Sequence, residues 1–125
     1  MSGFMNILLV AGGSAAGGVL RYLLGRWIQH LWARPFPLGT LLVNLAGCLL
    51  IGIFYGHSIR SGQSAQGTTL LLTTGFCGGF TTFSAFAYEN ILLMREGAYP
   101  EVLLYMAASA CIGILAAWAG LALAR

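Results

Sequence analysis

The sequence has very little charge. Of its 125 residues only nine are charged, six arginines and three glutamates, and lysine and aspartate are absent. Soluble domains carry about a quarter of their residues as charges, so this composition excludes an ordinary soluble protein. Four stretches contain no charged residue at all: Met1–Leu20, Pro35–Ile59, Ser61–Tyr88 and Val102–Ala124. Each is long enough for a helix of about 20 residues to cross a bilayer core of about 30 Å.

These stretches predict an all-α integral membrane protein. We expect a single domain, residues 1–125, with four transmembrane helices at about 4–28, 38–55, 68–94 and 99–123. No Lys or Arg precedes the first apolar run, so the run lacks the basic region of a secretory signal peptide and is interpreted as a permanent span. Because the number of spans is even, both termini are expected on the same side of the membrane.

The arginines say little about which side is cytoplasmic. The terminal side carries two arginines and the opposite side three, with one more nearby: Arg60 and Arg125 against Arg26, Arg34, Arg95 and the neighbouring Arg21. A difference of one or two arginines is a small positive-inside bias. Either the chain inserts one way by a small margin, or it inserts both ways. Insertion both ways would allow an antiparallel homodimer.

The usual chemistry of enzymes and of nucleic-acid-binding proteins is missing. The two histidines, His30 and His57, sit at predicted span ends, and neither a Ser/His/Asp nor an HExxH arrangement is present. The net charge of +3 comes from arginines near loops and helix ends, where long basic side chains reach the interface, so no nucleic-acid partner is expected. The three cysteines lack CxxC spacing and are interpreted as apolar filling. The chain is therefore not expected to be an enzyme.

The polar residues inside the spans are mostly neutral. A proton-coupled carrier needs a titratable group within a span, and only Glu89, near the end of the third span, comes close. The alternative function, a small proton-coupled four-helix exporter, depends on that residue, and a non-transporting assembly subunit is a third possibility. The other polar side chains can all donate hydrogen bonds: Thr40, Asn44, Thr81, Thr82, Ser84, Tyr105 and Ser109. Donors without carboxylates favour an anion.

Phenylalanines and glycines crowd the third span. Phe80, Phe83 and Phe86 recur at every third residue, which places them on one slowly drifting helix face. Such a stripe usually packs against a neighbouring helix. Alternatively the rings line an anion path with their positive edges, beside the hydroxyls of Thr82 and Ser84 and facing the second span.

The glycines of the same span allow two interpretations. Gly75, Gly78 and Gly79 each cost about 1 kcal/mol relative to alanine inside a helix. With the two threonines that follow, they predict a break near the middle of the span, where freed carbonyls could coordinate a small cation. Close packing between helices through small residues is an equal alternative.

Three segments resemble the Fluc/CrcB fluoride channel family: GGSAAGGVLRY (Gly12–Tyr22), GTLLVNLAG (Gly39–Gly47) and GFCGGFTTFSAF (Gly75–Phe86). The resemblance extends over all four spans. It implies a passive fluoride-selective channel that exports cytoplasmic fluoride. It also implies an antiparallel dual-topology homodimer with two pores, in the bilayer of the bacterial inner (plasma) membrane.

The resemblance also implies roles for individual residues. Phe83 and Phe86 would be the paired pore phenylalanines, and Phe80 a packing residue. The rest of the fluoride pathway would be Asn44, Thr40, Ser84, Tyr105, Ser109 and Arg21, together with Thr82. The carbonyls of Gly78 and Thr81 from both chains would hold a structural sodium ion. The family usually has a threonine where this chain has Ala85, so one hydroxyl of the polar track is missing here.

Overall fold

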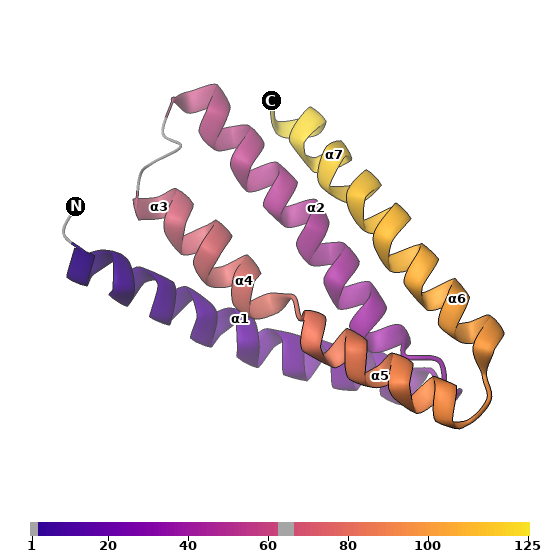
Figure 1. The fold of residues 1–125 in the computed structure, drawn as a ribbon. Coiled ribbons are helices and arrows are strands. Elements are labelled where there is room, and N and C mark those ends of the chain that lie inside the picture. The colour runs from indigo at the N-terminus through magenta and orange to yellow at the C-terminus, as the bar shows by residue number, and fades with distance from the viewer. Residues whose placement is uncertain (1–2, 63–66) are drawn as a thin grey trace.

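The computed structural model describes residues 3–62 and 67–125, and every regular element in these ranges is a helix (Figure 1). Four helical segments are long and apolar enough to cross a membrane: Gly3–Leu31, Leu38–Ser61, Gly67–Arg95 and Tyr99–Ala124. The expected all-helical protein with four membrane-length segments is thereby confirmed. The chain is a multi-pass membrane protein.

The first two segments are continuous helices and the last two are composite. They comprise α1 (Gly3–Leu31) and α2 (Leu38–Ser61), then α3 (Gly67–Leu70), the π-helix η1 (Leu71–Cys77), α4 (Gly78–Phe80) and α5 (Phe83–Arg95), then α6 (Tyr99–Ala107), the π-helix η2 (Ala108–Ile112) and α7 (Gly113–Ala124). Short π-helical stretches inside α-helices often occur at functional sites. Here one lies just before the Phe-rich part of the third segment, and the other contains Ser109.

The segments pack in two pairs. Helix α2 packs along α7, and α1 packs along η1 and α4. The start of α1 and the end of α7 lie at one end of the bundle, and the α1–α2 and α5–α6 connections lie at the other (Figure 1). In both pairs the backbones come close enough to exclude a side chain. A Cβ atom at Gly17 would collide with the carbonyl oxygen of Phe76, and one at Gly120 with that of Leu49. Such contacts let membrane helices associate without a hydrophobic driving force.

Helix α2 is longer than the sequence predicted. The expected span ended near Tyr55 and was followed by a polar loop from His57, whereas the helix continues to Ser61 and ends at Gly62 with φ +71°. The boundary was wrong because Ser58 is a buried side chain, hydrogen-bonded to Thr69 at 3.0 Å. The predicted loop continues through residues 63–66, which lie outside the described residues.

A tight turn joins α5 to α6. Gly97, with φ +74°, donates its amide to the carbonyl of Met94 (3.0 Å), and the Ala98 amide bonds to the carbonyl of Leu93 (2.9 Å). This pair of bonds closes a helix in the Schellman manner, and Pro100 lies in the first turn of α6, which begins at Tyr99. The turn folds α6 back along α5, so that side chains of the two helices meet at the site described next.

Candidate functional site

The third segment stops being helical for two residues. The backbone angles of Thr81 (φ −100°, ψ 154°) and Thr82 (φ −148°, ψ 124°) are those of extended chain. The last helical bond before them joins the Thr81 amide to the carbonyl of Cys77 at 3.0 Å. Non-helical backbone at membrane depth needs hydrogen-bond partners from elsewhere in the protein.

Asn44 of α2 supplies partners for one of the two extended residues. Its Oδ1 accepts the Thr82 amide at 2.9 Å, and its Nδ2 donates to the Thr82 carbonyl at 3.1 Å. The Thr82 hydroxyl oxygen then accepts the amide of Ala85 at 3.3 Å and so caps the start of α5. The side-chain amide of Asn44 thus makes two hydrogen bonds to the backbone of Thr82, where the sequence suggested a donor for an anion.

These hydrogen bonds leave two backbone carbonyls at the interruption without their usual helical donors. In an unbroken helix the Thr82 amide would bond to Gly78 and the Ala85 amide to Thr81. Both amides are directed elsewhere, so the carbonyls of Gly78 and Thr81 lose their regular donors. One of the two carbonyls between them in sequence has a different donor. That of Gly79 accepts a hydrogen bond from Arg21 Nε of α1 at 3.1 Å.

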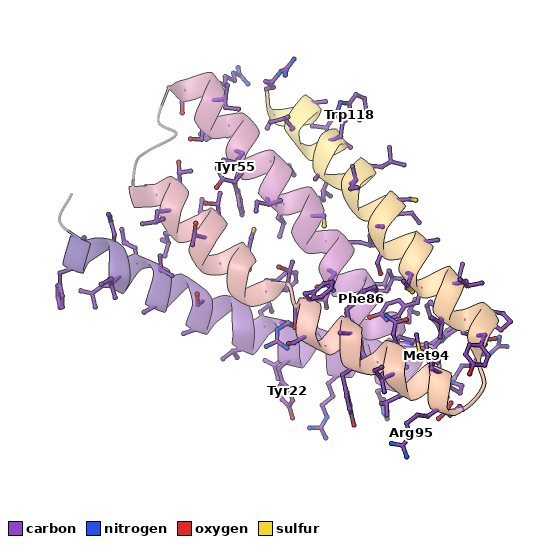
Figure 2. All side chains as sticks on the ribbon, in the orientation of Figure 1. Tyr22, Tyr55, Phe86, Met94, Arg95 and Trp118 are labelled. Carbon is purple, nitrogen blue, oxygen red and sulfur yellow. The ribbon has the colours of Figure 1, made fainter. Side chains whose placement is uncertain are left out.

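A row of aromatic rings begins at the start of α5. The ring centroids of Phe83 and Phe86 are 5.6 Å apart, and those of Phe86 and Tyr105 are 4.8 Å apart. The row ends at Phe36, whose ring meets Tyr105 edge-on at 5.5 Å. Phe83 is 78% exposed on the single chain and Phe86 is half-buried. Phe86 lies at mid-length of the bundle, between Trp118 near one end and Arg95 near the other (Figure 2).

Phe80 does not belong to this row. It precedes the two extended residues, is only 2% exposed, and stacks on Phe76 with a centroid distance of 5.5 Å. The expectation that Phe80, Phe83 and Phe86 share one helix face was wrong, because α4 and α5 are separate helices. Its interpretation as a packing residue agrees with its burial.

A carboxylate lies beside the aromatic row. Glu89 of α5 accepts the hydroxyl of Thr40 on Oε2 at 2.7 Å and the hydroxyl of Tyr105 on Oε1 at 2.8 Å. Tyr105 is fully buried. Both hydroxyls therefore donate to the carboxyl group of Glu89. The sequence pattern indicates Thr40 and Tyr105 as donors for an anion, whereas Glu89 accepts both hydroxyls. No spacing in the sequence predicts this, because the three residues lie on three helices.

Two cavities adjoin the interruption. The first has a volume of about 420 Å³ and is largely apolar; its lining includes Asn44, Cys48, Cys77, Thr81, Thr82, Phe83, Phe86 and Ser109. The second, about 240 Å³, is more polar; its lining includes Arg21, Arg26, Gln29, Thr40, Thr82 and Glu89. Thr82 lines both cavities. The first contains no charged side chain, and the second contains two arginines and a glutamate.

Comparison with known proteins assigns the chain to a family. Residues 8–121 match the family described as CrcB-like protein, Camphor Resistance (CrcB). The chain is 47% identical over 121 residues to the fluoride-specific ion channel FluC of Rhizobium etli, covering 97% of each chain. It is 43% identical over 119 residues to the fluoride-specific ion channel FluC of Pseudomonas putida, covering 95% of this chain and 96% of that one. The chain belongs to the CrcB family.

In this CrcB chain the structure places most of the predicted site residues around Thr82. Asn44 bonds to its backbone, and the Ser84 and Thr82 hydroxyl oxygens are 3.3 Å apart. Ser109 lines the larger cavity, and its buried hydroxyl has no hydrogen-bond partner among the described residues. Thr40 and Tyr105 lie apart from this group, on Glu89.

Arg21 and Gly78 complete the predicted set of this CrcB chain. Arg21 lies against the interruption through the Gly79 carbonyl, in the lining of the smaller cavity. Gly78 is exposed, and a Cβ atom there would meet nothing within 4 Å. Packing within the single chain therefore does not explain why this position is a glycine.

Proposed function

We propose that this chain is a channel, not an enzyme, and that it conducts fluoride passively and selectively out of the cytoplasm. The observation that carries the proposal is the interruption at Thr81–Thr82, which opens the third segment beside Phe83 and Phe86. Support comes from relatives named fluoride-specific ion channels that match nearly the whole chain. On this view the extended residues are the functional break that the glycine pattern predicted.

The linings of the two cavities suggest how an anion would pass. Arg21 and Arg26 would attract it into the smaller cavity, and Thr82 and Ser84 would offer hydroxyls on the way to the rings. In the larger cavity the positive ring edges of Phe83 and Phe86 and the unpartnered hydroxyl of Ser109 replace a fixed charge. Weak, successive sites of this kind permit both binding and release, as conduction requires.

A passive channel suffices for export. In acidic surroundings fluoride enters cells as neutral HF, which ionises in the neutral cytoplasm. An inside-negative potential then drives the anion out through the bacterial inner membrane, with about 2.3 kcal/mol for each charge per 100 mV. Fluoride removal would need no nucleotide and no coupled proton.

We also propose that the working unit is an antiparallel, dual-topology homodimer. Gly78, Phe83 and Ser84 of the third segment are exposed on the single chain, and Phe83 lines the larger cavity, so the segment has an uncovered face there. A second copy on this face would close the cavity. It would also explain the open space at Gly78, where a partner backbone can approach. The small arginine bias between the two ends permits insertion in both orientations.

A structural sodium ion fits the same face. The carbonyls of Gly78 and Thr81 lack the amides that a continuous helix would supply. The described residues contain no cluster of three His, Cys, Asp or Glu side chains that could hold a metal, so backbone oxygens are the natural ligands. Two such carbonyls from each of two chains would surround a cation on the dimer axis. The ion would join the chains and would not be transported.

Efflux from liposomes tests the channel proposal. We expect purified protein to release trapped fluoride rapidly when a potassium ionophore dissipates the voltage, and to release chloride negligibly under the same conditions. Release should not depend on a pH gradient of either sign. A flux that stops without the gradient would instead establish the proton-coupled exporter, with Glu89 as its carrier. No flux of either anion, with sodium present, would reject the channel.

Removal of sodium tests the proposed ion. Exhaustive exchange of sodium for N-methylglucamine should abolish fluoride efflux slowly, over the time in which the buried ion escapes, and returned sodium should restore it. The dimer is expected to weaken in parallel, measured by crosslinking in detergent. Efflux that is unchanged after complete exchange would contradict the assignment to Gly78 and Thr81.

A further inference from the structure

Gln29, in the last turn of α1, holds together the connection to α2. The two N–H groups of its Nε2 are shared among the carbonyls of Trp32 (3.2 Å), Arg34 (3.3 Å) and Phe36 (3.1 Å). Its Oε1 accepts the amide of Gly39 at 3.0 Å. The half-buried side chain of Gln29 is thus hydrogen-bonded to the backbone of the α1–α2 connection and to the first turn of α2.

The bond to Gly39 acts as the cap of α2. The first amides of a helix have no partner within the helix, and a side chain at the N-cap position usually accepts one of them. The N-cap residue of α2 is Pro37, whose side chain makes no capping hydrogen bond. Gln29 supplies the missing acceptor from another helix. The fit is tight, because a Cβ atom at Gly39 would collide with the carbonyl oxygen of Gly25.

The two segments that Gln29 holds both reach the group around Glu89. Phe36, whose carbonyl Gln29 binds, packs its ring edge-on against Tyr105 at 5.5 Å. Thr40 follows Gly39 directly and donates to Glu89 at 2.7 Å, while Tyr105 donates to the other carboxylate oxygen at 2.8 Å. A shift of the first turn of α2 would therefore move Thr40 off the carboxylate and Phe36 off the tyrosine together.

We propose that Gln29 is a positioning residue for fluoride permeation. Its amide fixes the rotation and height of the first turn of α2, which sets Thr40 on Glu89 and, one turn further along, Asn44 on Thr82. Gln29 itself lines the smaller cavity beside Thr40 and Glu89. This inference rests on the proposed function, and it adds a residue outside the three segments that carry the family resemblance.

The test compares three variants in fluoride-loaded liposomes. Gln29→Glu keeps the side-chain shape but sets an oxygen against three carbonyls, and Gln29→Met removes every hydrogen bond of the side chain. His30→Leu is the control on an exposed neighbour in the same turn. We expect the first two to lower fluoride efflux by about tenfold, as the loss of one or two hydrogen bonds at the pathway would do. The control should conduct normally. Helix content and elution volume should match the wild type in all three.

Combining the Gln29 and Thr40 substitutions distinguishes a positioning role of Gln29 from a general structural role. In a Thr40→Val background, Gln29→Met should cause a smaller loss than it does in the wild type, because the contact between Thr40 and Glu89 that Gln29 positions is already gone. A full additional loss in that background would overturn the proposal, as would normal efflux in both Gln29 variants. Failure of both Gln29 variants to fold would also overturn it, since the residue would then serve folding in general. A wild type without fluoride efflux would instead reject the proposed function, so the two failures are distinguishable.

Discussion

Isoleucine in place of Phe83 or Phe86 is expected to abolish fluoride efflux while the protein stays folded. Isoleucine is apolar and of similar bulk, but it has no ring edge to meet an anion. Phe83 is 78% exposed on the single chain, so its replacement should cost that chain little stability. Phe86→Ile loses the ring contact to Tyr105 and should cost about 1–2 kcal/mol.

The measurement is fluoride efflux from liposomes at equal protein density, with thermal unfolding in detergent run alongside. Phe4→Ile is the matched control, because Phe4 is 70% exposed near the start of α1 and lines neither cavity beside the interruption. Normal flux in both pore variants would remove the rings from the pathway. Flux lost equally in the control would point to a general effect of removing phenylalanine.

The second large effect is expected at Asn44. Asn44→Leu should stop efflux and destabilise the protein, because the amide and the carbonyl of Thr82 both lose their partner. Each polar group left unsatisfied in an apolar setting costs about 1–3 kcal/mol. Asn44→Asp keeps the acceptor for the Thr82 amide, so it should be less destabilised. It should still conduct poorly, since it places a carboxylate in the lining of the larger cavity.

Unfolding in detergent and fluoride efflux together decide the Asn44 prediction. Asn6→Leu, in the first turns of α1, serves as the control for loss of an asparagine from a membrane segment. If Asn44→Leu unfolded like the wild type, the two bonds to Thr82 would carry little of the stability of the interruption. If it also conducted normally, Asn44 would have no part in the pathway.

The membrane architecture could be predicted because the bilayer imposes it. Uncharged stretches of sufficient length leave little choice but transmembrane helices. The end of α2 was missed for a related reason: a hydrophobicity pattern treats Ser58 as a loop residue, whereas its hydroxyl is satisfied by Thr69. A hydrophobicity pattern along one segment cannot predict hydrogen bonds between polar residues of different helices.

The glycines of the third segment show why two interpretations looked equally good. Gly75 and Gly79 lie against the backbone of α1, where a Cβ atom at Gly79 would meet the carbonyl of Ser14. Gly78 faces open space, next to the interruption. Close packing and a break thus draw on different glycines of one motif. The position of the neighbouring helix α1 decides which glycines pack closely and which lies free beside the break. The sequence of the third segment alone does not give that position.

The environment of Ala85 also becomes clear only in the structure. Its backbone amide bonds to the Thr82 hydroxyl oxygen, whichever side chain the residue carries. The helix cap therefore does not need the threonine that the family resemblance led us to expect there. What the alanine would remove is one hydroxyl of the proposed polar track, and the hydroxyls of Thr82 and Ser84 remain.

The hydrogen bonds at the interruption also imply an order of assembly in the cell. The third segment provides one cap of its own, from Thr82, but the other bonds come from Asn44 of α2 and Arg21 of α1. Both donors leave the ribosome before the third segment does. The first two helices can therefore be in the membrane before the third segment arrives. The extended residues of the third segment then form as it packs against them.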